Sequence, residues 1–272
     1  MSSKPTDVAD AGPLVAVTHG DDAYDNARRA LAALDLTTAA GKRVLLKPNA
    51  GRVAAGASGI VTSPQVVAAA IDAFRAAGAE VAVGESPIVG VDVHEAFATM
   101  GLTAVANERD CPLIDLDAPP CTVTEVPEGR AIHRLKLCTP VLEYDLIVSI
   151  PVMKTHMHTG ATLSVKNMKG CLWRRSKVDL HMLPPVAGEA ERPLNIAIAD
   201  LATVLRPDLA LIDGTVGLEG LGPSAGTPKR TNTVVASADA FAADAVACTL
   251  MGVDLVDVPH VRLGAARGLG VV

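Results

Sequence analysis

Residues 151–170 concentrate the side chains that bind anions and move protons. They include Lys154, Lys166, Lys169, His156 and His158. Lysine supplies a point charge for a carboxylate or phosphate, and histidine exchanges protons near neutral pH. The segment follows residues 145–150, an aliphatic run that is typical of a strand buried on both faces of a sheet. Because ligands bind beyond the carboxyl ends of strands in open α/β sheets, this position predicts a ligand site.

The first half of this segment is expected to form a loop. Pro151 cannot extend a central strand, because it lacks the N–H group that a ladder needs. Side chains on a loop can converge on a ligand. Lys154 and His156 are therefore candidate catalytic residues, and His158 is a candidate substrate ligand. The alternative is a polar surface loop without a function.

The second half is expected to open a helix. Its hydroxyl, amide and ammonium groups belong to Thr162, Ser164, Lys166, Asn167 and Lys169. Together with the free N–H groups of a helix start, such side chains can hold an anion. The alternative is an exposed helix face, because the two lysines stand three positions apart. The pattern differs from a Walker phosphate-binding loop, since no G-x-x-x-x-G-K-[ST] occurs.

Another strand end with polar groups is expected near the N-terminus. Residues 43–46 predict a strand that runs into Lys47 and Asn49. Lys47 is a candidate catalytic residue and Asn49 a candidate substrate ligand, although a lysine at a strand end is often simply solvated. Pro48 favours an extended conformation for the lysine before it.

A glycine-rich segment, residues 213–228, follows a predicted strand at 209–212. It carries two carboxylates, Asp213 and Glu219, which are candidates for proton transfer. Gly220 is a candidate for close backbone approach to a ligand. Prolines at 223 and 228 interrupt any following helix, which excludes a dinucleotide-binding fingerprint. The alternative is a set of tight turns.

His181 lies in a stretch expected to form a lid or an irregular loop, and it is a candidate substrate ligand. With His156 and His158 it could ligate a metal if a carboxylate joined them, but no H-E-x-x-H or comparable spacing occurs. No metal site is therefore predicted, and a histidine-ligated metalloenzyme stays an alternative.

Composition narrows the function classes. The chain of 272 residues has a net charge of −6 and only six aromatic residues, which argues against a nucleic-acid partner. No apolar run approaches the roughly 18 to 20 residues that a membrane span needs, and the N-terminus lacks a signal core, so we expect a cytoplasmic protein. Five widely spaced cysteines without a C-x-x-C pair predict no iron–sulfur cluster, zinc knuckle or disulfide scaffold. No cofactor is predicted.

The elements that must position these residues alternate between strands and helices. Strand patterns at 43–46 and 80–83 enclose residues 62–78, which read as a hydroxyl cap, a proline, an amphipathic helix and a glycine stop. Residues 111–140 instead carry short alternating runs, at 113–116, 121–126 and 133–137, that predict an antiparallel insertion. The prediction is one α/β domain over 13–272, with a mostly parallel, Rossmann-like sheet flanked by helices. Residues 1–12 are expected to be a disordered tail.

Several short motifs together resemble one family. They are Lys47-Pro48-Asn49, Thr62-Ser63-Pro64, Gly84-Glu85-Ser86-Pro87, Pro151-x-x-Lys154-Thr155-His156, Lys166-Asn167-x-x-Gly170, Asp213-Gly214, Glu219-Gly220-x-Gly222-Pro223, and Asp239 with Asp244. Their order and spacing, from about Lys42 to Gly252, resemble the DUF362 family. The resemblance implies site roles for the motif residues Lys47, Lys154, His156, Lys166, Asn167, Asp213, Glu219 and Asp239. Many members also carry a ferredoxin-like iron–sulfur domain, which this sequence lacks.

Two main hypotheses follow. The first is a cofactor-independent enzyme that performs acid–base chemistry, by isomerisation, epimerisation, elimination or cyclisation, on a small anionic or carbonyl-bearing metabolite. The second is a protein that delivers a ligand or cluster to a partner without chemistry of its own. A homodimer is compatible with an apolar, aromatic-poor chain of this size.

Overall fold

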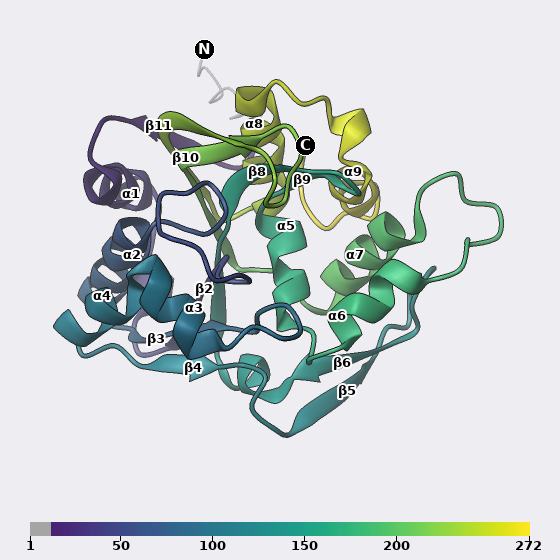
Figure 1. Ribbon diagram of the computed structural model, residues 1–272, viewed down its shortest axis with the longest axis horizontal. Coiled ribbons are helices and arrows are strands. Elements are labelled where there is room, and N and C mark those ends of the chain that lie inside the picture. The colour runs from purple at the N-terminus through teal and green to yellow at the C-terminus, as the bar shows by residue number, and fades with distance from the viewer. Residues whose placement is uncertain (1–11) are drawn as a thin grey trace, which may run out of the picture.

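The computed structural model describes residues 12–272 and shows an α/β fold with helices on both sides of a large sheet (Figure 1). Within these residues the main sheet has nine strands, seven of them in the order β1-β11-β10-β7-β2-β3-β4, with β8 on β10 and β9 on β8. The predicted fold class is confirmed. The expected tail at 1–12 lies, apart from Gly12, outside the described residues.

The centre of the sheet is parallel. Its strands are β10 (Leu209–Glu219), β7 (Leu146–Ile150), β2 (Arg43–Pro48), β3 (Glu80–Glu85) and β4 (Leu113–Asp115). The prediction for 113–116 was wrong, because β4 pairs in parallel with β3 at the sheet edge. Helices α3 (Val93–Met100) and α4 (Leu102–Glu108) form the crossover that returns the chain in the same direction. The rest of the predicted insertion is an antiparallel pair, β5 (Cys121–Glu125) with β6 (Arg134–Cys138).

Two segments expected to be loops are strands. Residues 152–162 form the hairpin β8 (Val152–His156) and β9 (Gly160–Thr162), and β8 pairs with β10. Strand β10 continues through the predicted glycine-rich loop to Glu219, antiparallel to β11 (Thr227–Ser237). The glycines serve this packing: a Cβ atom at Gly217 would lie 2.8 Å from the carbonyl oxygen of Met153. Strand β1 (Ala16–His19) pairs with β11 at the other edge.

The helices cover the two faces of the sheet with separate cores. On one face, α1 (Ala23–Ala32), α2 (Pro64–Ala76), α3 and α4 pack on alternate strand residues such as Val44 and Leu46. On the other face, α5 (Ser164–Asn167), α7 (Pro193–Val204), α8 (Ala240–Met251) and α9 (Pro259–Ala265) pack on Leu45 and its neighbours. This alternation follows the two-residue period of a strand.

The stretch around His181 is not an irregular loop, because α6 (Ser176–Asp179) continues into a 3-10 turn (Leu180–Met182). Across residues 12–272, each helix falls short of the length and apolar character needed to cross a membrane.

Candidate functional site

The predicted lysines and histidines surround a cavity beyond the carboxyl ends of β2 and β3. The cavity has an inner chamber of about 120 Å³ and an outer chamber of about 340 Å³. The inner chamber alone is lined by Lys47, Glu85, Ser86, Asn167, Gly170 and Lys177. The outer chamber alone is lined by Arg52, Lys154, His156, Met157, His158, His181 and Pro223. The wall that both share consists of Asn49, Gly51, Ile88, Thr162, Lys166 and Lys169.

In the inner chamber, Lys47 forms a fully buried ion pair. Its Nζ atom lies 2.8 Å from Glu85 Oε1 and donates to the carbonyl oxygen of Pro48 at 3.0 Å. Glu85 also accepts hydrogen bonds from the backbone N–H groups of Ala50 and Ser86, at 2.8 and 2.9 Å. A Cβ atom at position 170 would lie 2.6 Å from Lys47 Nζ, which explains the glycine there. Both charges are compensated, so this lysine holds two strand ends together.

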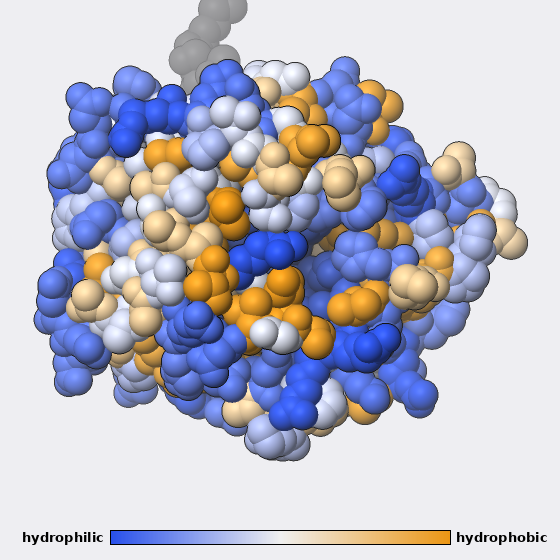
Figure 2. All heavy atoms as spheres, viewed as in Figure 1, coloured by the Kyte–Doolittle hydropathy of each residue, from blue (hydrophilic) through white to orange (hydrophobic). Residues whose placement is uncertain are grey.

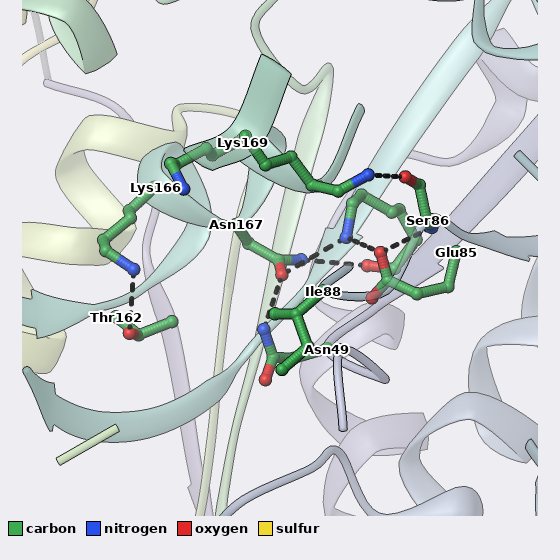
Figure 3. A pocket seen from close by; sticks show the side chains of 12 residues that line it. Asn49, Glu85, Ser86, Ile88, Thr162, Lys166, Asn167 and Lys169 are labelled. Carbon is green, nitrogen blue, oxygen red and sulfur yellow. Dashed lines mark hydrogen bonds and ion pairs between the residues drawn. The ribbon is translucent and has the colours of Figure 1, made fainter. Parts of the chain in front are cut away.

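The Asn167 side chain lies in the inner chamber beside Asn49, which lines both chambers (Figure 3). Its amide nitrogen donates to the carbonyl oxygen of Lys47 and to Ser149 Oγ, each at 3.1 Å. Its Oδ1 atom accepts from Asn49 Nδ2 at 3.0 Å, and Asn49 Oδ1 in turn accepts from Lys154 Nζ at 2.8 Å. The network fixes the position of Lys154 relative to the buried ion pair.

A second ion pair closes the far side of the inner chamber. Lys177 Nζ lies 3.2 Å from Asp117 Oδ1, donates to the carbonyl oxygen of Leu172 at 2.8 Å and hydrogen-bonds Ser86 Oγ. Sequence reasoning missed Glu85, Ser86 and Lys177 as site residues. Glu85 is the last residue of β3 and Ser86 follows it, both within the Gly84–Pro87 motif, so their position at a strand end was the available signal.

The outer chamber is cationic. Among the described residues that line it, four are lysine or arginine and none carries a carboxylate. Lys166 Nζ has one hydrogen bond of 3.3 Å, to Thr162 Oγ1, and Lys169 Nζ lies 3.1 Å from His181 Nε2. Lys154 uses two donors, on Asn49 Oδ1 and the carbonyl oxygen of Ile60 at 2.6 Å. Donor capacity is therefore left over for a ligand, because an ammonium group has three N–H bonds.

Burial and mutual repulsion lower the pKa values of these lysines. Desolvation, then the charges of Arg52 and Lys47, lowers the pKa of Lys154 to about 7. Desolvation and Lys177 lower the pKa of Lys169 to about 8. Desolvation, then the charges of Lys169 and Lys154, lowers the pKa of Lys166 well below its usual value. A lysine with a pKa near 7 can both take up and release a proton at neutral pH.

Three histidines, His156, His158 and His181, line the outer chamber, and burial favours the neutral imidazole for His156 and His181. Burial and Lys166 lower the pKa of His156 to about 2, and burial and Lys169 lower that of His181 to about 4. Neighbouring ring centroids are 5.8 Å apart, both from His156 to His158 and from His158 to His181. Within residues 12–272, no group of three His, Cys, Asp or Glu side chains is arranged to hold a metal ion.

Other predicted site residues lie outside the cavity lining. Asp213 is buried and accepts from the backbone N–H groups of Ser63 and Thr215, at 2.6 and 2.9 Å, and burial raises its pKa. Glu219 is exposed and pairs with Lys229 at 2.9 Å. The carbonyl oxygen of Gly220 accepts from Thr155 Oγ1.

Two further polar residues act at helix starts. Ser164 is buried, and its backbone N–H donates to Asp244 at 2.7 Å. Asp239, a motif residue, caps α8 by accepting from the N–H groups of Phe241 and Ala242. The structure thus brings together the lysines, histidines, Asn49, Thr162 and Asn167, and gives the acidic candidates other partners.

Comparison with known proteins places this chain in a protein family. The profile described as "Domain of unknown function (DUF362)" matches residues 44–249, which is most of the chain. The chain belongs to the DUF362 family. The resemblance inferred from the short motifs is confirmed. A thylakoid-associated protein of Synechocystis sp. is 28% identical over 229 residues, covering 84% of this chain and 69% of that protein.

A solved structure shares the fold. The lactate racemase apoprotein from Thermoanaerobacterium thermosaccharolyticum superimposes with a TM-score of 0.59 at 16% sequence identity. The match covers 86% of this chain but only 56% of the racemase, so the chain spans little more than half of that protein. At 16% identity, the likeness shows that the two proteins share a fold.

Proposed function

We propose that this protein is an enzyme that moves a proton on a small anionic, carbonyl-bearing metabolite, in a reaction of the racemase, isomerase or lyase type. The observation that carries the proposal is the outer chamber, where Lys154, Lys166 and Lys169 line one space without a carboxylate. Lys154 is buried and Lys166 and Lys169 are half-buried. Ammonium groups that are withdrawn from water without a carboxylate partner are unfavourable in the free protein, and an anionic ligand would relieve that cost.

The lysines suggest a division of roles. Lys166 and Lys169 carry spare donors and would bind the carboxylate or phosphate of the substrate and the oxygen on which enolate charge develops. Lys154 is held by Asn49 and Ile60, has a third N–H bond to offer, and has a pKa of about 7. It is the preferred group to remove a proton next to the carbonyl and to return it, because a base works best when its pKa is near the working pH.

The histidines complete this arrangement. His156 Nδ1 accepts from the backbone N–H of His158 at 3.2 Å, so its Nε2 atom is the one that carries the proton as a donor. Neutral imidazoles can donate hydrogen bonds to a carbonyl oxygen without adding charge. The proposed step transfers only a proton, and we propose that it needs no redox cofactor. The likeness to a racemase is an analogy for the fold and for the isomerase class of reaction alone.

Deuterium exchange tests the proposal without knowledge of the substrate. The protein would be incubated in D₂O with a panel of small 2-hydroxy acids, 2-oxo acids and phosphorylated carbonyl compounds, and loss of the C–H signal followed by proton NMR. We expect exchange into at least one compound, abolished by Lys154→Met and retained in Glu219→Gln. Binding without exchange in every compound would contradict the enzyme and favour ligand delivery.

A further inference from the structure

The mouth of the outer chamber is apolar, in contrast to its cationic wall. Ile88 lines both chambers and is 40% exposed, and Met157, in the turn between β8 and β9, is 61% exposed. Pro223 lines the same chamber from the loop after β10. Three separate segments therefore present apolar groups beside lysines.

Further exposed apolar residues adjoin these three. Val89 follows Ile88, Met182 follows His181, and Leu221 precedes Gly222, whose carbonyl oxygen accepts from the N–H group of Met157. Figure 2 shows apolar side chains near the centre of this face, beside strongly hydrophilic ones, where Figure 1 places α5 and the loop before α3. Exposed apolar residues that gather at a cavity mark a binding surface.

We propose that the substrate of this site is amphiphilic: an anionic head bound by the lysines, and an apolar tail that lies across Ile88, Met157 and Pro223. This inference rests on the proposed function and adds the class of substrate to it. A single ligand can reach both the lysines and the apolar residues, because they line the same cavity. Ile88 lines both chambers, and Met157 and Pro223 line the outer chamber together with the lysines. A wholly polar metabolite would leave these side chains in water.

The side chains at the mouth suit a tail of variable shape. Met157, like Met182 beside the chamber, is unbranched and polarisable, so it adapts to different apolar surfaces. Each methylene group that leaves water contributes up to about 0.8 kcal/mol, which is close to a fourfold gain in affinity. Because the mouth is partly open, we expect about a two- to threefold gain for each added methylene.

A chain-length series tests this inference. Dissociation constants of acetate, butanoate, hexanoate and octanoate would be measured by NMR chemical-shift titration of the full chain. In the wild type we expect affinity to rise about two- to threefold per methylene from butanoate onwards. Ile88→Ser and Met157→Ser should flatten this increase, which is read as the ratio of octanoate affinity to acetate affinity in each variant. Val256→Ser, at a residue 60% exposed on the 3-10 turn before α9, is the matched control and should change neither.

The outcomes separate this inference from the function on which it rests. If acetate binds, Lys166→Met abolishes that binding, and chain length has no effect, the amphiphilic substrate is wrong and the anion site stands. If carboxylates of every length fail to bind, the anion site itself is wrong and the inference falls with it. A chain-length effect that survives both serine substitutions would place the tail elsewhere and also overturn the inference.

Discussion

The two chambers of the cavity place the same residue type in opposite electrostatic surroundings. Lys47 in the inner chamber is 1% exposed and has Glu85 at 2.8 Å, which itself accepts two backbone hydrogen bonds. Lys166 and Lys169, on the wall toward the outer chamber, have a hydroxyl and an imidazole as neighbours. The lysines therefore differ in their partners: Lys47 has a compensating carboxylate, whereas Lys166 and Lys169, which are half-buried, have none among their hydrogen-bond partners.

The largest expected effect is a loss of stability when the ion pair in the inner chamber is broken. Glu85→Gln should lower the free energy of unfolding by about 3 to 5 kcal/mol, because Lys47 would be left buried without a counter-charge. Urea denaturation measures the change. Adding Lys47→Met to this variant should restore much of the loss, and failure to do so would show that the pair is not what Glu85 contributes.

Substitution of a lysine in the outer chamber should change ligand affinity more than stability. Lys166→Met should weaken butanoate binding about 10- to 100-fold, the usual size of a hydrogen bond to a charged group. The free energy of unfolding should be unchanged or raised, since a half-buried amino group without a carboxylate partner is removed. NMR titration and urea denaturation of the same sample check both. A stability loss as large as that of Glu85→Gln would contradict the contrast between the chambers.

Stability and binding should depend on pH in opposite directions. The pKa of Lys154 is about 7 in the folded chain and near 10.5 when unfolded. Between these values the unfolded state binds more protons, so the lysine's penalty is full below pH 7 and is lost as pH rises toward 10.5. Relative to Lys154→Met, wild-type stability should rise by up to about 1.4 kcal/mol per pH unit in this window. Butanoate affinity should fall over the same range, and parallel denaturation and titration series measure both.

The smallest effect is expected at an exposed pair. Glu219→Gln removes the partner of Lys229, and both side chains are more than half exposed. We expect a change of less than about 1 kcal/mol in the free energy of unfolding and none in butanoate affinity. Reduced deuterium exchange in this variant would instead restore Glu219 as a catalytic residue.

Much of the fold could be predicted because strand and helix periodicity is local. Residues 145–150 and the helix after Thr62 form β7 and α2 at nearly the expected bounds. The hairpin β8–β9 was missed because its charged and polar side chains hide the alternation, although they face a cavity rather than solvent. The length of β10 was missed because its glycines indicate turns locally, whereas they permit close contact with Met153 on β8.

For the site, the expectation that ligands bind beyond the carboxyl ends of strands predicted which lysines lie together. It did not predict the role of each lysine. The partner of Lys47 is 38 residues away, and that of Lys177 is 60 away. The residues next to each lysine in the sequence therefore do not identify its partner. The role of Asp213 was also hidden in the sequence. Only the fold shows that its carboxylate accepts hydrogen bonds from the backbone N–H groups of Ser63 and Thr215.

The most direct test of the outer chamber as an anion site is an NMR titration of the lysine Nζ atoms in ¹⁵N-labelled protein, with and without butanoate. We predict one ammonium that titrates near pH 7 and is absent in Lys154→Met, and one near pH 8 that is absent in Lys169→Met. Both should move upward when butanoate binds. Lysines that all titrate near their ordinary value, unaffected by the anion, would contradict the claim that the outer chamber is an uncompensated anion site.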